Sequence, residues 1–484
     1  MSSVYITFGL YFVVLLALGI VAWRRTQDLS DYILGGRSLG SGVTALSAGA
    51  SDMSGWLLLG LPGAAYLTGL DAGWIALGLL IGTWMNWLLV ASRLRTATEN
   101  LEDSLTLPDY FQRRFADDSR FLRIIPGIFI FIFFSLYVSS GLVAGGRLFE
   151  EVFGLPYMWA VTTGVLAIII YTFLGGYLAV SWTDALQALL MLAALVAVPL
   201  MVFSTGDTGL FEAVRAKNPE MLNPFTNPSG EFIGLIAIIS SMAWGLGYFG
   251  QPHILARFMG IHHVSQLTRA RRIAVSWAAI GLVAAVLVGL AGIGGLETTL
   301  EGADSEKVFI RLVEVLFHPL VAGICLAAIL AAIMSTADSQ LLVASSVVSE
   351  DFWKGLLRTD ASQTELVWVG RLSVIVIALI AFWFARDPDS KVLDLVSYAW
   401  AGLGAAFGPV IVMSLYWAKM SRWGAAAGMI VGGVTVIVWQ PLEGGLFDVY
   451  EILPGAIFAA LAAFIFSMLL PDEKATRQYE RMLD

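Results

Sequence analysis

The chain has few of the residues on which soluble enzymes and metalloproteins depend. Among 484 residues there are one cysteine, Cys325, four histidines and only 13% charged side chains. A single cysteine excludes an intramolecular disulfide and a metal site built from thiolates. The net charge of −9 comes without a basic cluster, which excludes a nucleic-acid-binding protein. The loops hold no phosphate-binding P-loop and no nucleophile–base pair, so we expect neither ATP-driven transport nor an enzyme.

Hydrophobic residues make up 58% of the chain and gather in long runs. Because one membrane crossing needs roughly 20 apolar residues, these runs predict about thirteen transmembrane helices. Transmembrane strands would instead alternate over about ten residues, so we expect an all-α polytopic membrane protein. The first run has no basic segment before it and is expected to be a retained helix, not a signal peptide. The predicted spans are residues 5–23, 42–66, 73–90, 124–143, 156–173, 180–203, 232–252, 273–293, 320–347, 367–384, 393–417, 424–439 and 452–470.

Lysine and arginine are distributed unevenly between the two sides of these spans. With the N-terminus placed outside, 21 of the 28 basic residues fall on the inner side and 7 on the outer side. Loops on the cytoplasmic side carry such an excess. We therefore predict an outer N-terminus, an inner C-terminus and a multi-pass location in the inner (cytoplasmic) membrane of a cell.

Spans two to six, residues 42–203, and spans seven to eleven, residues 232–417, form two groups of five. An odd number of crossings makes the second group enter the membrane from the opposite side. Each group opens with a span interrupted by glycine, at residues 52–55 and 244–250. Such paired breaks indicate the binding site of a secondary transporter. Residues 1–484 are then one transporter domain, with an extra helix at 5–23, two helices in 424–470 and a cytoplasmic tail at 471–484.

Asp52 stands near the middle of span two, where a carboxylate costs about 2.5–3.5 kcal/mol to insert. The neighbouring Ser54 and Gly55 allow the helix to open there, which frees backbone carbonyls near Ala50 and Met53. These oxygens suit a small hard cation, and we expect sodium. The alternative interpretation is that Asp52 caps a half-helix.

Span nine is the second source of cation ligands. Ala332, Ser335 and Thr336 lie three and four residues apart, so they share one helix face. The alternative is that both hydroxyls bond back to carbonyls of their own helix. Asp338 follows one turn inward, where it would tune cation affinity, join a second cation site or face an inner vestibule. Asp184, at the inner end of span six, is interpreted first as a helix N-cap and second as a residue on the cation exit.

Aromatic residues surround the second break. Trp244, Tyr248 and Pro252 follow one another at intervals of four, and Tyr137 and Trp56 come from spans four and two. Aromatic walls with a few polar tips suit a small zwitterion with an apolar body, whereas helix packing is the alternative. His253 is expected in an inner loop, with no histidine in mid-membrane, which disfavours a proton relay.

Several strings resemble the solute:sodium symporter family, in particular its bacterial proline-transporting members. They are YILGGRSLG at 32–40, AGASDMSGWL at 48–57, WGLGYFGQPHILA at 244–256, residues 330–336 and ASQTELVWVGR at 361–371. The likeness runs from about residue 31 to about residue 470. Asp338 and Ser339 depart from an enteric member of the family, in which Ser and Cys are expected there, and this departure bears on sodium affinity and stoichiometry.

The resemblance implies two inverted five-helix repeats of the LeuT type and sodium-coupled uptake of L-proline by alternating access. The implied sodium site is Ala50, Met53, Ala332, Ser335 and Thr336, with Asp52, Ser54 and Gly55 beside it. The implied proline site is Tyr137, Trp244, Tyr248 and Pro252, with Trp56 close by. Arg37 and Asp184 match positions that affect coupling on the inner side. The expected partners are L-proline, sodium and the lipid bilayer, with no obligate protein partner.

Two other functions remain open from the sequence. One is sodium symport of another small solute, such as pantothenate, a short carboxylate or another amino acid. The other is a solute sensor on the same fold, which is disfavoured because such sensors usually carry a long signalling domain and only about fourteen residues follow the last span.

Overall fold

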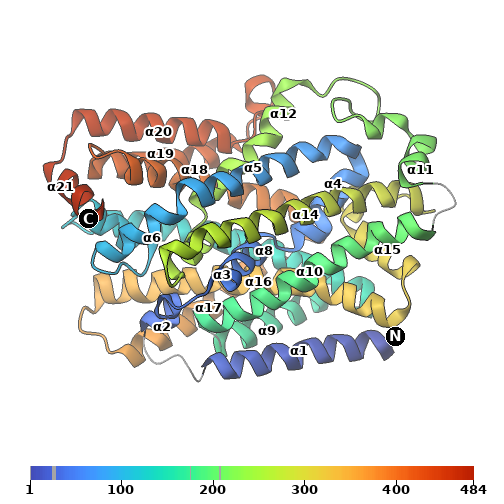
Figure 1. Ribbon diagram of the computed structural model, residues 1–484, viewed down its shortest axis with the longest axis horizontal. Helices are drawn as coiled ribbons and strands as arrows, with labels where there is room; N and C mark the ends of the chain where they lie inside the picture. Colours follow the sequence, from blue (N-terminus) through green and yellow to red (C-terminus); the bar gives the residue numbers. More distant parts are fainter. Residues whose placement is uncertain (1, 24–28, 175, 206–208, 484) are drawn as a thin grey trace.

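The described residues of the computed structural model, 2–23, 29–174, 176–205 and 209–483, are helical apart from turns, loops and two isolated β-bridges. The helices run side by side along the long axis, with α1 starting at one end and α21 lying at the other (Figure 1). Within these ranges, ten helices are long and apolar enough to cross a membrane, and two shorter apolar stretches are Tyr157–Ile170 and Gly234–Gly250. Arg24 and Arg25, counted above on the inner side, lie outside the described residues.

The longer helices follow the predicted spans, although several extend well beyond them. Their bounds are α1 Ser2–Trp23, α5 Gly73–Leu89, α8 Phe121–Phe153, α9 Tyr157–Leu174, α10 Tyr177–Thr205, α14 Leu267–Gly295, α16 Pro319–Ser346, α17 Gln363–Phe384, α18 Val392–Tyr416, α19 Arg422–Trp439 and α20 Ile452–Leu469. The short helices outside the spans include α2 Leu29–Leu34, α6 Ala91–Asn100, α7 Leu107–Arg114, α11 Leu210–Lys217, α15 Val308–Leu316 and α21 Glu473–Leu483.

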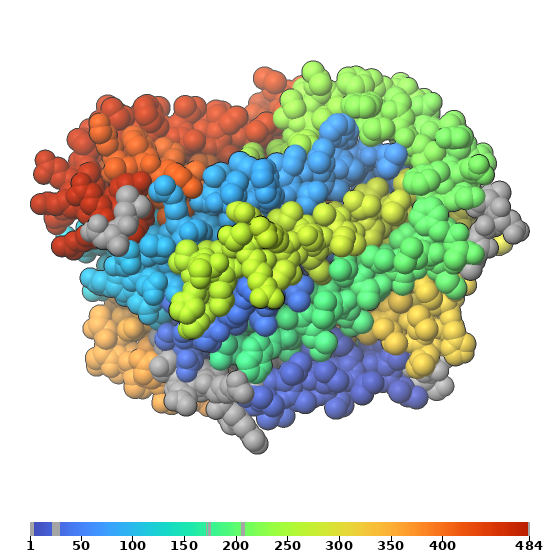
Figure 2. Space-filling model, viewed as in Figure 1, coloured from blue at the N-terminus to red at the C-terminus, as the bar shows by residue number. Residues whose placement is uncertain are grey.

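The outer surface is built from apolar side chains. In the face drawn in Figure 2, segments of α5, α14, α10 and α1 lie side by side. Trp84, Ile280, Leu189 and Leu10, one from each of these helices, are exposed. Because a protein in water buries such residues, this surface suits contact with lipid.

Two spans are interrupted, as the sequence predicted. The first consists of α3 (Ser41–Asp52), a break at residues 53–55, the π-helical turn η2 (Trp56–Gly60) and α4 (Leu61–Thr68). The second consists of α12 (Gly234–Ala243), the 3-10 segment η5 (Trp244–Gly250), extended Gln251 and α13 (Pro252–Gly260). Proline at the first position of α13 starts the inner half-helix, since its missing N–H has no helical partner there in any case.

Glycine residues let the backbone of η5 lie directly against neighbouring helices. A Cβ built on Gly245 would lie 2.2 Å from the carbonyl oxygen of Gly78, and one on Gly82 would lie 2.2 Å from that of Gly245. On the other side, a Cβ on Gly247 would lie 1.8 Å from Trp400 Nε1. The segment is therefore fixed between α5 and α18.

Candidate functional site

The break in the first interrupted span lies against the middle of α16. Ser335 Oγ donates a hydrogen bond to the Ala50 carbonyl oxygen at 2.8 Å, and Thr336 Oγ1 donates to the same oxygen at 3.2 Å. Ser335 also reaches the Ala332 carbonyl at 3.2 Å, so a bond within its own helix, the alternative expected from the sequence, is present in addition. Ala50, Ala332, Ser335 and Thr336 thus meet in one buried cluster of oxygens. Met53, at the break itself, is also buried and follows three residues after Ala50.

Asp52 is the last residue of α3, and its carboxylate does not cap a half-helix. Instead Asp52 Oδ2 accepts a hydrogen bond from the Tyr248 hydroxyl at 2.5 Å, and among the described residues Oδ1 has no partner. Ser54 Oγ accepts the backbone N–H of Trp56 at 3.4 Å. Gly55 provides close packing, because a Cβ there would lie 2.8 Å from that of Ala144 on α8. The carboxylate therefore joins the two interrupted spans.

Three of the aromatic residues expected around the substrate, Trp56, Tyr137 and Tyr248, come together near Asp52. Trp56 Nε1 and the Tyr137 hydroxyl both donate to the Asp52 carbonyl oxygen, at 3.2 and 3.4 Å. Tyr248 is buried, and Pro252 begins α13 just inward of it. The spacing of four does not align Trp244 with Tyr248 on one face, because a 3-10 segment turns every three residues. Trp244 instead stacks on Tyr450, with centroids 5.4 Å apart.

Asp184 belongs to a buried polar cluster formed with side chains of α3, α13 and α16. The N-cap interpretation is wrong, because α10 begins at Tyr177 and Asp184 lies two turns inside it. Asp184 Oδ2 accepts from Ser47 Oγ at 2.7 Å, from Arg257 Nη2 at 3.0 Å and from Ser339 Oγ at 3.4 Å. Asp338 is fully buried rather than facing open water, and within the described residues neither of its carboxylate oxygens has a hydrogen-bond partner. The nearest charges are Asp184 and Arg257.

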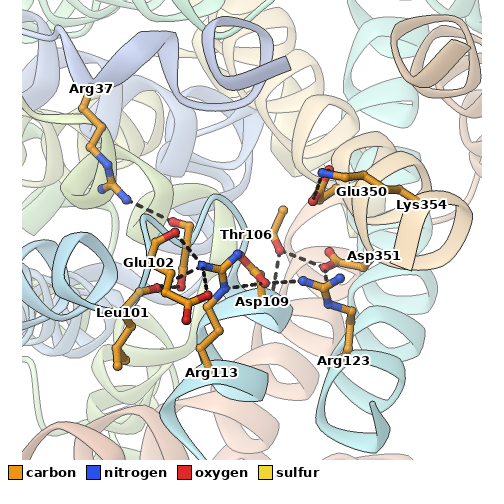
Figure 3. A network of polar contacts seen from close by, with 11 residues as sticks. Arg37, Leu101, Glu102, Thr106, Asp109, Arg113, Arg123, Glu350, Asp351 and Lys354 are labelled. Atoms are coloured by element: carbon orange, nitrogen blue, oxygen red, sulfur yellow. Dashed lines mark hydrogen bonds and ion pairs between the residues drawn. The ribbon is translucent and has the colours of Figure 1, made fainter. Parts of the chain in front are cut away.

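Arg37 lies apart from these residues, near the charged inner end of the molecule. Its side chain is buried and donates to Asp103 Oδ1 and to the carbonyl oxygen of Met259, both at 2.6 Å. Burial lowers the pKa of Arg37, and Asp103 opposes this fall. Figure 3 shows Arg37 beside a network that continues through the α6–α7 loop to α8 and to Glu350, Asp351 and Lys354, which lie beyond the end of α16. Arg37 therefore connects the segment before α3 to the end of α13 and to the α6–α7 loop.

Three residues of this region escaped the sequence analysis. His253 was expected in an inner loop, but it is buried in the first turn of α13 with its ring edge-on to Tyr137 at 6.1 Å. Asn86 Nδ2 donates to the Tyr248 carbonyl at 3.0 Å, and Trp400 Nε1 donates to the Trp244 carbonyl at 2.7 Å. The only signal for His253 was its place directly after Pro252, whereas no local pattern marked the other two.

Comparison with known proteins places this arrangement in a family. The model of the sodium:solute symporter family matches residues 32–432. The sodium/proline symporter of Salmonella typhimurium is 54% identical over 469 residues, covering 96% of this chain and 92% of that protein. The high-affinity proline transporter PutP of Bacillus subtilis is 49% identical over 479 residues, covering 97% of this chain and 99% of that protein.

Solved structures agree on the fold. A sodium-coupled sialic acid symporter, described in a substrate-bound outward-open state with a novel sodium site, aligns with a TM-score of 0.80 at 18% identity, over 97% of this chain and 98% of the other. MhsT in complex with L-phenylalanine aligns with a TM-score of 0.53 at 14% identity, over 88% and 97%. These neighbours have the LeuT-type helical fold. The chain belongs to the sodium:solute symporter family.

Proposed function

We propose that this protein couples the entry of sodium to the uptake of L-proline by alternating access across the inner (cytoplasmic) membrane of a bacterium. Identity of about one half to sodium/proline symporters over almost the whole chain supports proline as the solute. The observation that carries the mechanism is the pair of hydroxyls, Ser335 and Thr336, on the freed carbonyl of Ala50. No enzymatic activity is proposed.

Sodium is proposed to bind between the break in the first interrupted span and α16. Its oxygen ligands come from Ala50, Met53, Ala332, Ser335 and Thr336, while Asp52, Ser54 and Gly55 shape the break. Hydroxyl and carbonyl oxygens are ligands that hard cations prefer. Asp338 lies one turn inward, and its carboxyl oxygens have no hydrogen-bond partner in the described residues, so they are proposed as further oxygen ligands for a cation in this region.

Proline is proposed to lie between the two interrupted spans, against Trp56, Tyr137, Trp244, Tyr248 and Pro252. Its ring suits these aromatic faces, and its carboxylate suits the positive end of a half-helix. Arg37 and Asp184 are proposed to act on the inner side, where their buried hydrogen bonds join separate elements.

The membrane potential is proposed to drive the uptake together with the sodium gradient. A potential of 100 mV contributes about 2.3 kcal/mol for each charge that enters, which is enough to accumulate proline roughly 50-fold.

The proposed topology has thirteen crossings with the N-terminus outside and the C-terminus inside. Residues 42–203 and 232–417 form the two inverted repeats, helix 5–23 precedes them, two helices in 424–470 follow them, and 471–484 is the cytoplasmic tail. The two interrupted spans at matching positions support this division. Cysteine-accessibility mapping of single residues in the terminal segments tests the orientation.

The proposal is tested by uptake into proteoliposomes with purified protein. We expect labelled proline to accumulate under an imposed sodium gradient and not under a lithium or proton gradient of equal size. Unlabelled pantothenate, short carboxylates and other amino acids should compete poorly. Accumulation that does not depend on sodium, or that another solute abolishes at lower concentration than proline does, would show the proposal to be wrong.

Thr336→Ala tests the sodium site. Removing one of about five ligands should raise the sodium concentration for half-maximal uptake at least about tenfold, since a lost bond to a charge is worth about 1.5–3 kcal/mol. Thr435→Ala is the matched control, because Thr435 Oγ1 bonds only to the Val431 carbonyl within α19. A Thr336→Ala protein with the original sodium dependence would contradict the site.

A further inference from the structure

Trp400 is a buried residue of α18, outside the two interrupted spans. Its indole nitrogen donates a 2.7 Å hydrogen bond to the carbonyl oxygen of Trp244, the first residue of η5. A short 3-10 segment in a broken span has carbonyls with poor internal partners. Trp400 therefore supplies, from another helix, an additional partner for the first carbonyl of η5.

The same indole packs along the rest of η5. A Cβ built on Gly247 would lie 1.8 Å from Trp400 Nε1 and 2.3 Å from its Cε2, so the ring occupies the space of the missing side chain. The ring meets that of Tyr248 edge-on, with centroids 5.1 Å apart and planes at 87°. The Trp400 carbonyl accepts Gln251 Nε2 at 3.1 Å. One residue thus contacts positions 244, 247, 248 and 251.

Trp400 is itself held by an anchored helix. At the start of α18 the backbone N–H groups of Val392 and Leu393 donate to Glu306 Oε2 and Oε1, at 2.9 and 3.0 Å. Glu306 also pairs with Arg147 of α8 at 2.6 Å. The indole therefore contacts the backbone of Trp244 and the ring of Tyr248, the two aromatic residues of η5 that are proposed to contact proline.

We infer that Trp400 is a positioning residue of the substrate site, which sets Trp244 and Tyr248 for proline without itself binding sodium. The inference rests on the proposed function, in which these two residues contact proline. It predicts that weakening Trp400 lowers the affinity for proline and leaves the requirement for sodium in place.

The test compares Trp400→Phe with the unaltered protein in proteoliposomes. The variant keeps an aromatic ring and loses the N–H donor, so we expect the KM for proline to rise about tenfold, with maximal rate and sodium dependence within about twofold. Trp74→Phe is the matched control, because Trp74 Nε1 donates to the Pro224 carbonyl at the same 2.7 Å, away from η5. The KM of Trp74→Phe for proline should stay within about twofold of that of the unaltered protein. Melting temperature without proline, which a purely structural role would lower, should be similar in both variants.

A second pair of substitutions, at Gly247 and Trp400, tests the same inference without relying on Trp400→Phe. Gly247→Ala should raise the KM for proline because its Cβ displaces the indole, and adding Trp400→Leu should reverse part of that rise. If Trp400→Phe does not accumulate in membranes, the comparison of Gly247→Ala with the double variant tests the inference instead. An unchanged KM in Trp400→Phe, or no reversal in the double variant, would overturn the inference. Failure of the unaltered protein to take up proline would instead overturn the proposed function.

Discussion

The hydrogen bond from Tyr248 to Asp52 joins the two proposed sites at the scale of single residues. Asp52 is adjacent in sequence to Met53 of the proposed sodium site, and Tyr248 lies in the proposed proline site. The carboxylate oxygen and the hydroxyl are 2.5 Å apart, and both side chains are buried. Loss of this hydrogen bond would therefore affect the residue next to the proposed sodium site.

Tyr248→Phe should reveal this connection. The substitution keeps the ring and leaves Asp52 without its hydroxyl donor, at a cost of about 1.5–3 kcal/mol. We expect the sodium concentration for half-maximal proline uptake to rise roughly 10- to 100-fold. Tyr416→Phe, which loses a hydroxyl bond to the Leu89 carbonyl far from both sites, should leave it unchanged. Equal sodium dependence in the two variants would contradict a connection through Asp52.

At the scale of elements, the contact between α5 and η5 depends on glycine from both sides. A Cβ on Gly82 would lie 2.2 Å from the Gly245 carbonyl oxygen and 2.5 Å from its Cα. These are backbone atoms, so η5 must move to accept the methyl group. Packing changes of this kind cost about 1–3 kcal/mol.

Gly82→Ala should therefore reduce proline uptake at least about tenfold, while some protein still reaches the membrane. Gly73→Ala is the control on the same helix, since a Cβ there meets nothing within 4 Å. Uptake is divided by the amount of protein in the membrane, measured by immunoblot. Normal uptake by Gly82→Ala would show that η5 tolerates displacement.

The helices and their breaks could be predicted from the sequence, whereas the contacts between helices could not. Glycine and serine at the breaks act locally, so both interruptions were predictable. The sequence analysis ended span seven at Pro252 and therefore missed the half-helix α13 that follows. Proline in fact suits the first turn of a helix. His253 was predicted to lie in a loop for the same reason. Asp184 was misassigned because α10 starts earlier than hydropathy indicated. Trp400 lies 156 positions from Trp244, and only the folded packing brings them together.

At the scale of the whole molecule, the inner end is joined by charged residues from several elements. Asp351, in the π-helical continuation of α16 (η8, Val347–Leu357), accepts from Thr106 Oγ1 at 3.0 Å and pairs with Arg123 Nε of α8 at 3.3 Å (Figure 3). Arg123 also pairs with Asp109 of α7. Since η8 continues the helix of Ser335 and Thr336, the proposed sodium site and this network lie on one continuous helix.

A cavity of about 20 Å³ lies above this network and is lined by Pro252, Ala256 and Met259 of α13, among others. It is also lined by residues of α2, of the segment that contains Thr106, of α8 and of α16. A space of this size holds about one water molecule, so proline would pass here only if these elements separated. Weakening the bonds of Asp351 should favour that separation.

Asp351→Asn should thus expose the inner side of the site more often. In a Cys325→Ser background, Ala256→Cys supplies a reporter on the cavity wall, labelled by an impermeant maleimide from the cytoplasmic side. We expect Asp351→Asn to speed labelling about tenfold, which corresponds to about 1.4 kcal/mol. Lys354→Gln is the control, because Lys354 pairs with Glu350 of the same helical turn and connects no separate elements. Arg123 keeps Asp109 as a partner, so the variant should still fold. An unchanged labelling rate would mean that Asp351 does not hold the inner side closed.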